Sequence, residues 1–278
     1  HAPRAPSPRW RIYWGQPHPC RQMFPLRDDN PTLRTPIVTY ALIAANVAVW
    51  VLVQGMGTDP QLAESICNLA LIPGEFLRTL PAGSPVPMGP GVACVVSDAP
   101  SWYKPVSSMF MHGSWMHLIG NMWFLHIFGN NVEDSQGKFR YLVFYLLCGI
   151  AAALTQALLD PRGNIPMVGA SGAIGGVMGA YVVLYPRVQI HMFVFLFVFI
   201  TRIVVPAYFM LGYWFLLQLA SGWMSHGQGG GGTAFGAHAG GFLAGALLIF
   251  LFKDNGLVAQ HRAGAHNWQP GHFRDTGY

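Results

Sequence analysis

Residues 139–159 read FRYLVFYLLCGIAAALTQALL, and Arg140 is the one charged side chain among them. A helix needs about 20 mostly apolar residues to cross a bilayer, so this stretch predicts a transmembrane helix. Five more stretches of this kind lie at residues 36–56, 107–129, 169–185, 200–220 and 233–252. The sequence therefore predicts an all-α, polytopic membrane protein with six transmembrane helices. The start of the fifth is ambiguous, because the apolar run already begins at Met192 and Arg202 and Pro206 interrupt it.

The composition of the whole chain agrees with a membrane protein. Apolar residue types make up 52% of the 278 residues and charged types only 10%, whereas soluble domains carry about 25% charge. The net charge of +5 comes from scattered arginines without a dense basic run, which argues against a nucleic-acid partner. Four cysteines in a chain of this length do not make a disulfide scaffold.

The distribution of lysine and arginine predicts the orientation in the membrane. With the N-terminus in the cytoplasm, only Arg78, Lys104 and Arg162 lie outside, and the other 13 of the 16 basic residues lie inside. We therefore expect both termini in the cytoplasm, and we expect the membrane to be a bacterial inner (cell) membrane. The predicted organisation is a Pro/Arg-rich tail at 1–35, a membrane domain at 36–253 and a cytoplasmic C-terminal tail at 254–278.

The segments outside the predicted helices carry two open questions. The long first loop, at about 57–104, contains Cys67 and Cys94 on the outer side, and either a disulfide or two buried thiols fits the sequence. The C-terminal tail contains His261, His266 and His272, for which a solvated tail is favoured over a weak metal site. The N-terminal tail shows no helical period, so we expect it to be irregular.

Polar side chains inside a bilayer are costly, so those in the predicted helices are candidates for function. His117 and Asn121 are four residues apart and share one face near the outer end of the second helix. Hydrogen bonding between helices is the alternative role for this pair. His112 lies five residues before His117, and we expect it to shape the turn that precedes regular helix.

Two further polar residues stand at the outer ends of predicted helices. Ser171 follows Gly169 and precedes Gly172 at the start of the fourth helix, and His238 lies among small residues in the sixth. The second, fourth and sixth helices all run inward, so Ser171, His238, His117 and Asn121 come within roughly 10 Å of the outer face.

These are the groups that acyl transfer requires: a hydroxyl nucleophile, a general base and hydrogen-bond donors for an oxyanion. All eleven acidic residues fall in predicted tails or loops, so we expect a Ser–His dyad without a carboxylate. The chain lacks an H-E-x-x-H motif and a compact set of His, Cys and acidic ligands, so we expect neither a metal nor another cofactor.

At these residues the chain resembles the rhomboid family of intramembrane serine proteases. The motifs are His112-x4-His117-x3-Asn121, Gly169-Ala170-Ser171-Gly172 and Ala237-His238-Ala239-Gly240. The resemblance implies a six-helix rhomboid bundle with Ser171 as nucleophile, His238 as general base, His117 and Asn121 on the oxyanion side, and a water-filled cavity that is open to the outside. His112, Gly169 and Gly172 would be structural residues near the site. Substrates would be single-span membrane proteins within the bilayer.

The chain departs from the family pattern at Gly175, where some members carry an aromatic residue that stacks on the histidine. What orients His238 is therefore open at this point. A catalytically inactive relative that binds membrane helices is the alternative function, and a solute transporter is a weaker one because mid-membrane ionisable groups are scarce. The glycine-rich loop at 221–232 directly precedes His238, and our hypothesis is a mobile lid over the cavity mouth, with a passive linker as the alternative.

Overall fold

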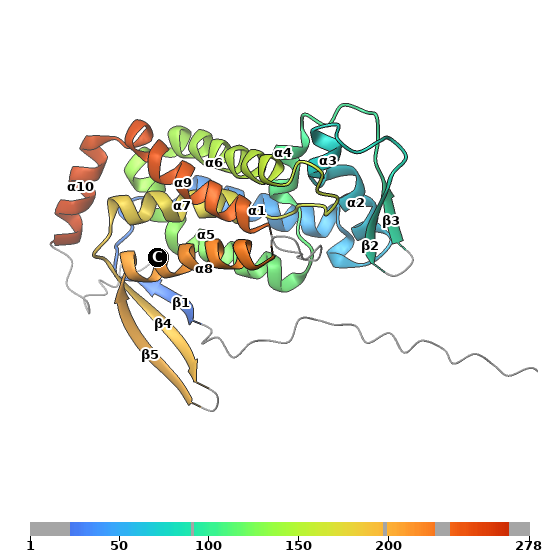
Figure 1. Ribbon diagram of the computed structural model, residues 1–278. Coiled ribbons are helices and arrows are strands. Elements are labelled where there is room, and N and C mark those ends of the chain that lie inside the picture. The colour runs from blue at the N-terminus through green and yellow to red at the C-terminus, as the bar shows by residue number, and fades with distance from the viewer. Residues whose placement is uncertain (1–22, 90–91, 197–198, 226–233, 267–278) are drawn as a thin grey trace, which may run out of the picture.

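The structure is a computed structural model, and residues 23–89, 92–196, 199–225 and 234–266 are described. Most of these residues are helical (Figure 1). The long helices are α1 (Ile37–Leu52), α5 (Trp115–Gln136), α6 (Lys138–Leu159), α7 (Ser171–Leu184), α8 (Ala207–Ser225), α9 (Phe235–Phe252) and α10 (Asn255–His266). The short helices are α2 (Gln61–Leu69), α3 (Pro73–Phe76) and α4 (Lys104–Ser107). The strands are β1 (Met23–Asp28), β2 (Pro85–Gly89), β3 (Val92–Val95), β4 (Gln189–Leu196) and β5 (Phe199–Pro206).

Helix α7 forms the centre of the bundle. It packs against α5, α6 and α9, and nearly all of its residues are buried. Its contact with α9 brings the two backbones together, because glycines line both sides. A Cβ added to Gly179 would overlap the carbonyl group of Phe242, and one added to Gly245 would overlap the backbone of Gly176. The glycine faces in the sequence therefore serve close approach between helices.

The structure has a helix in each of the six predicted stretches, but their lengths and polarities differ. Within the described residues, α6 and α9 are long and apolar enough to cross a bilayer. Helices α1 and α7 are apolar but have only 16 and 14 residues. The number of membrane crossings, six, thus stays a prediction.

The chain is not purely helical, and one difference falls in the fifth stretch. Residues 189–196 and 199–206, which are rich in Val, Ile and Phe, form the antiparallel strands β4 and β5, and α8 begins only after Pro206. β-Branched and aromatic residues favour strands, which explains why the apolar run is not helical from its start. The two strands extend away from the helices (Figure 1).

A second difference concerns the N-terminal tail. Residues 23–28 form β1, which pairs with β4 in a sheet of order β1-β4-β5. Trp123 Nε1 on α5 donates a hydrogen bond of 2.7 Å to the Pro25 carbonyl oxygen. The prediction of an irregular tail is therefore wrong for this segment, because its partners lie far along the chain. Residues 1–22 are outside the described part.

The C-terminal tail also differs from its prediction as a solvated segment. Residues 255–266 form α10, which packs against α5. His261 is fully buried, with its ring 4.9 Å from that of Tyr185 and its Nε2 3.4 Å from Asn131 Nδ2. In the described residues, no group of three His, Cys, Asp or Glu side chains could hold a metal ion. His272 lies outside those residues.

The first loop is folded and closed by a disulfide between Cys67 and Cys94. The bond joins α2 to the hairpin β2–β3, which resolves the question that the sequence left open. Within this loop, Glu75 and Lys104 form a buried ion pair of 2.8 Å. Leu71 exchanges two backbone hydrogen bonds with Met167, four residues before Ser171. The first loop thus supports the chain that leads into α7.

Candidate active site

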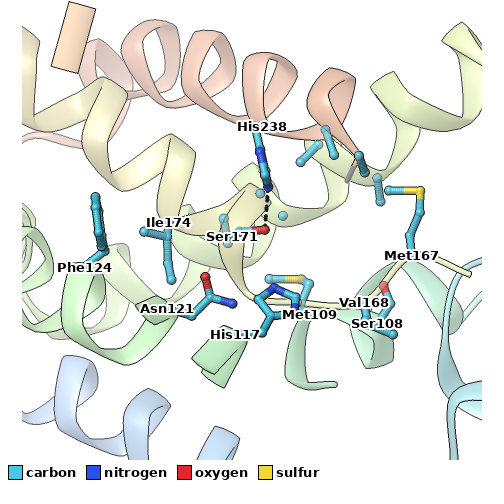
Figure 2. A pocket seen from close by; sticks show the side chains of 18 of the residues that line it. Ser108, Met109, His117, Asn121, Phe124, Met167, Val168, Ser171, Ile174 and His238 are labelled. Carbon is cyan, nitrogen blue, oxygen red and sulfur yellow. Dashed lines mark hydrogen bonds between the residues drawn. The ribbon is translucent and has the colours of Figure 1, made fainter. Parts of the chain in front are cut away.

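The centre of the site is the contact between Ser171 and His238. Ser171 is the first residue of α7, and His238 lies in the first turn of α9. Ser171 Oγ is 2.7 Å from His238 Nε2, a distance typical of a hydrogen bond (Figure 2). A serine and a histidine that are 67 residues apart in sequence are therefore paired at one end of two adjoining helices.

The turn before Ser171 depends on Gly169. Its φ is +124°, a conformation that side chains other than hydrogen rarely allow. Its backbone N–H donates to the Ser108 carbonyl oxygen at 2.9 Å. A Cβ at this position would lie 2.7 Å from His117 Nε2. Gly169 thus lets the chain pass between Ser108 and His117 directly before the serine.

Gly172 allows close packing between α6 and α7. A Cβ at this position would overlap the side chain of Ala152 on α6. The missing side chain allows α6 to approach the first turn of α7, beside Ser171. The structure therefore places both predicted glycines next to the serine.

His117 and Asn121 lie on α5, across the cavity from His238 (Figure 2). Ser114 caps this helix, since its Oγ accepts a hydrogen bond from the His117 backbone N–H at 3.2 Å. Asn121 is 8% exposed, and its Nδ2 has no hydrogen-bond partner in the described residues. A buried amide donor without a partner beside the serine is available to an incoming oxygen atom.

His112 does not line the cavity. It is fully buried behind His117, and the two ring centroids are 5.1 Å apart. The side chain of Gln54 holds its backbone with hydrogen bonds of 2.7 and 2.8 Å. Its position before α5 is that of a residue that shapes the turn.

The sequence did not single out two residues on α8 that contact His238. Gln218 Oε1 is 2.8 Å from His238 Nδ1, and the Trp214 ring is 5.9 Å from the imidazole. The two are four residues apart, so they share one face of the helix. A single amide on an otherwise apolar helix, one turn after a tryptophan, is the signal that could have drawn attention to them.

A cavity of about 410 Å³ surrounds these groups. Its walls come from α4 and the residues directly after it, from α5, α6, α7, α8 and α9, and from the segment before Ser171, and they are mostly apolar. Among the described residues, no acidic side chain and no cysteine lines it. The polar groups that face it include Ser171, His238, His117, Asn121 and Gln218. The arrangement can support nucleophilic attack by a hydroxyl with a neutral imidazole as base.

Residues 99–255, more than half of the chain, match the model of the rhomboid domain. This chain belongs to the rhomboid family. The family is membrane-integral, and the matched residues of this rhomboid include every group that faces the cavity in the list above.

Three curated relatives of this rhomboid illustrate the range of the family. It is 29% identical to "Rhomboid protein 1, mitochondrial" of Saccharomyces cerevisiae, over 85% of this chain and 58% of the relative. It is 34% identical to "Rhomboid protease AarA" of Providencia stuartii, over 32% of this chain and 37% of the relative. It is 33% identical to "Inactive rhomboid protein 1" of Drosophila melanogaster, over 30% of this chain and 6% of the relative. The matches thus span less than two thirds of each relative's length.

These names bear on two predictions. One relative is named a protease and another is named inactive, so family membership alone does not assign catalysis to this rhomboid. One is named mitochondrial and another comes from a bacterium, so the relatives do not support the bacterial inner membrane over other membranes.

Proposed function

We propose that this rhomboid is an intramembrane serine endopeptidase, which hydrolyses peptide bonds in or near transmembrane helices of membrane proteins. The observation that carries the proposal is the 2.7 Å contact between Ser171 Oγ and His238 Nε2 at the wall of a cavity. Both side chains are partly buried, and a serine and histidine used only for packing would not need a cavity beside them.

In the proposed reaction, His238 Nε2 takes the proton of Ser171 as Oγ attacks the peptide carbonyl carbon. The tetrahedral intermediate collapses when His238 returns that proton to the leaving amine. Water then hydrolyses the acyl-enzyme by the same two proton transfers, in which His238 again acts as base and acid. The chain needs no metal or other cofactor for this sequence of steps.

The oxyanion of the intermediate would receive donors from three directions. Asn121 Nδ2 is buried and without a partner, His117 faces the same space, and the Ser171 backbone N–H stands at the start of α7. The positive end of the helix dipole favours negative charge there. One such donor is typically worth about 2.7–4 kcal/mol of transition-state stabilisation.

The proposed topology has six transmembrane helices. It places the first loop (loop 1, about 57–104) outside and both ends of the membrane domain on the cytoplasmic side. The elements of loop 1 cluster at one end of the bundle, and α10 lies at the other (Figure 1). The Cys67–Cys94 disulfide supports an oxidising environment for loop 1. Single-span membrane proteins are the proposed substrates, which would enter the cavity from within the bilayer.

The second candidate is a catalytically inactive protein that binds membrane helices. The relative named inactive favours it, whereas the Ser171–His238 hydrogen bond counts against it. A serine-directed phosphonate separates the two functions. Covalent labelling at Ser171 supports the protease, and complete lack of labelling in folded protein supports the inactive binder.

The direct test reconstitutes the protein in liposomes with a panel of tagged single-span substrates. The Ser171→Ala and His238→Ala variants should each abolish the cleavage that the unaltered protein performs, with normal expression and folding. Cleavage that persists unaltered in either variant would falsify the dyad.

A further inference from the structure

We propose that Gln218 is a positioning residue for the dyad, which holds the His238 imidazole in the tautomer that can accept the Ser171 proton. The inference rests on the proposed protease function and adds a third member to its site. The carrying observation is the distance of 2.8 Å between Gln218 Oε1 and His238 Nδ1. The opposite ring nitrogen, Nε2, is the one that contacts Ser171.

A neutral imidazole carries one proton, on either of its two nitrogens, and only the other nitrogen can act as base. If Gln218 presents its carbonyl oxygen, Nδ1 must carry the proton in order to donate. Nε2 is then free to accept from Ser171 Oγ. If the proton were on Nε2, the serine could only accept a hydrogen bond, and the dyad would be inactive. The amide acceptor therefore selects the reactive tautomer.

The same hydrogen bond serves the charged state of the histidine. When Nε2 takes the serine proton, the imidazolium still donates from Nδ1 to Gln218 Oε1. A carboxylate would stabilise that charge more strongly, but an isolated carboxylate is costly in a mostly apolar cavity. A neutral amide is an acceptor that such surroundings tolerate.

The orientation of Gln218 is fixed by packing, because the preceding turn of α8 packs against α9. Trp214 lies four residues before Gln218 and packs against both His238 and Phe242, with ring-centroid distances of 5.9 and 6.1 Å. Phe215 stacks on Phe242 at 4.8 Å. These contacts fix the rotation of α8, so that the next turn directs Gln218 at Nδ1.

The residues that orient the His238 imidazole lie on α8 and not on α7. Gly175, one turn after Ser171, lies against α9, and a Cβ there would be 3.0 Å from the His238 carbonyl oxygen. The residue on α7 that could have stacked on the imidazole is thus kept small by the close helix contact. Trp214 instead supplies a ring tilted by 38° to the imidazole, and Gln218 supplies a hydrogen-bond acceptor, both from the neighbouring helix.

The test compares two variants in the full-length, reconstituted protein. Gln218→Met keeps the length of the side chain but removes the acceptor, and Gln218→Glu restores an acceptor with a charge. We expect Gln218→Met to lower kcat by about tenfold to a hundredfold, the effect of leaving one buried donor unpaired. KM should change by less than about twofold, because Gln218 acts through His238 and not on the substrate.

Gln218→Glu distinguishes positioning from packing. A carboxylate keeps the tautomer but favours the protonated imidazole. At high pH, Gln218→Glu should therefore have a higher kcat than Gln218→Met. The acid limb of its kcat–pH profile should lie about 1 pH unit higher than in the unaltered protein. The matched control is Leu219→Met on the adjacent, 47% exposed position of α8, which should cleave as the unaltered protein does.

The tautomer is also measurable without a substrate. Nitrogen-15 NMR of the histidine rings, with His238 assigned through His238→Ala, should show a proton on Nδ1 in the unaltered protein and a mixture of tautomers in Gln218→Met. The inference is overturned if Gln218→Met keeps the kcat and the ring spectrum of the unaltered protein, or if it raises KM alone. Cleavage by the unaltered protein that equals that of Ser171→Ala would instead overturn the protease function, and the NMR result would still decide the role of Gln218.

Discussion

Asn121 has a side-chain donor that makes no structural hydrogen bond in the described residues. Its Nδ2 is buried and lacks a partner in the described residues, a state that costs free energy unless a ligand pairs with it. The ring of the neighbouring His117 lies so close to Gly169 that a Cβ on the glycine would be 2.7 Å from His117 Nε2. The turn before the serine and the wall that faces it are thus formed by the same few residues.

We expect Asn121→Ala to lower kcat by about 10²- to 10³-fold, because one oxyanion donor is lost. KM should change little, since the donor acts on the transition state more than on the bound substrate. The measurement is steady-state cleavage of a single-span substrate in liposomes. An unchanged kcat would remove Asn121 from the proposed oxyanion site.

At the scale of elements, the contact between α7 and α9 builds the dyad. Ser171 and His238 each stand in the first turn of their helix, so the two helices must run side by side at short separation to join them. The glycines at 176, 179, 241 and 245 permit that separation. Each glycine costs roughly 1 kcal/mol of helix propensity relative to alanine, which tertiary packing in the bundle must offset.

Strand β1 attaches the N-terminal segment to the far end of α7. Asp28 accepts a hydrogen bond from the Tyr181 hydroxyl, and burial raises the pKa of this carboxyl to about 7. An unfolded Asp has a pKa of about 3.9, so the folded protein binds more protons than the unfolded chain between these values. The stabilising contribution of Asp28 is full below about pH 4 and is lost as the pH rises through about 7.

We therefore expect the midpoint of thermal unfolding in detergent to fall between pH 5 and pH 8 more steeply in the unaltered protein than in Asp28→Asn. The amide of the variant cannot ionise, so its difference from the unaltered protein isolates this one group. A pH dependence that is the same in both proteins would show that Asp28 does not contribute.

At the scale of the whole molecule, the hairpin β2–β3, which holds Cys94 of the disulfide, lies at one end of the bundle, and the sheet of β1, β4 and β5 lies below the helices toward the other end (Figure 1). The loop-1 end also holds the opening turns of α5, α7 and α9, where the site is. Loop 1 reaches the site through the backbone pairing of Leu71 with Met167. The proposed orientation places this end on the oxidising side.

The orientation predicts which cysteines an impermeant maleimide reaches in intact cells. In a Cys20→Ser background, Cys94→Ser frees Cys67, which should be labelled from outside. Arg187→Cys, at an exposed position three residues after the end of α7, should be labelled only after the membrane is permeabilised. The reverse pattern would invert the proposed topology, and cleavage by both variants serves as the control for folding.

Much of the membrane domain was predictable because its signals are local. Each of the six apolar stretches contains a helix, and the polar residues near the start of the second, fourth and sixth stretches stand out against apolar neighbours. Ser171, His238, His117 and Asn121 were found in this way, and the structure brings them to one cavity. Strands β4 and β5 were missed because a short apolar run does not by itself distinguish strand from helix.

The sequence by itself determined that the chain belongs in a membrane and which polar residues stand apart there, because burial of apolar side chains and the cost of polar ones depend on residue type and spacing. Only the tertiary structure decided that Cys67 pairs with Cys94, that β1 joins β4, and that Gln218 meets His238. These contacts join segments that are far apart in the sequence. Which segments meet depends on how the helices and strands pack in space, and no local sequence pattern encodes that packing.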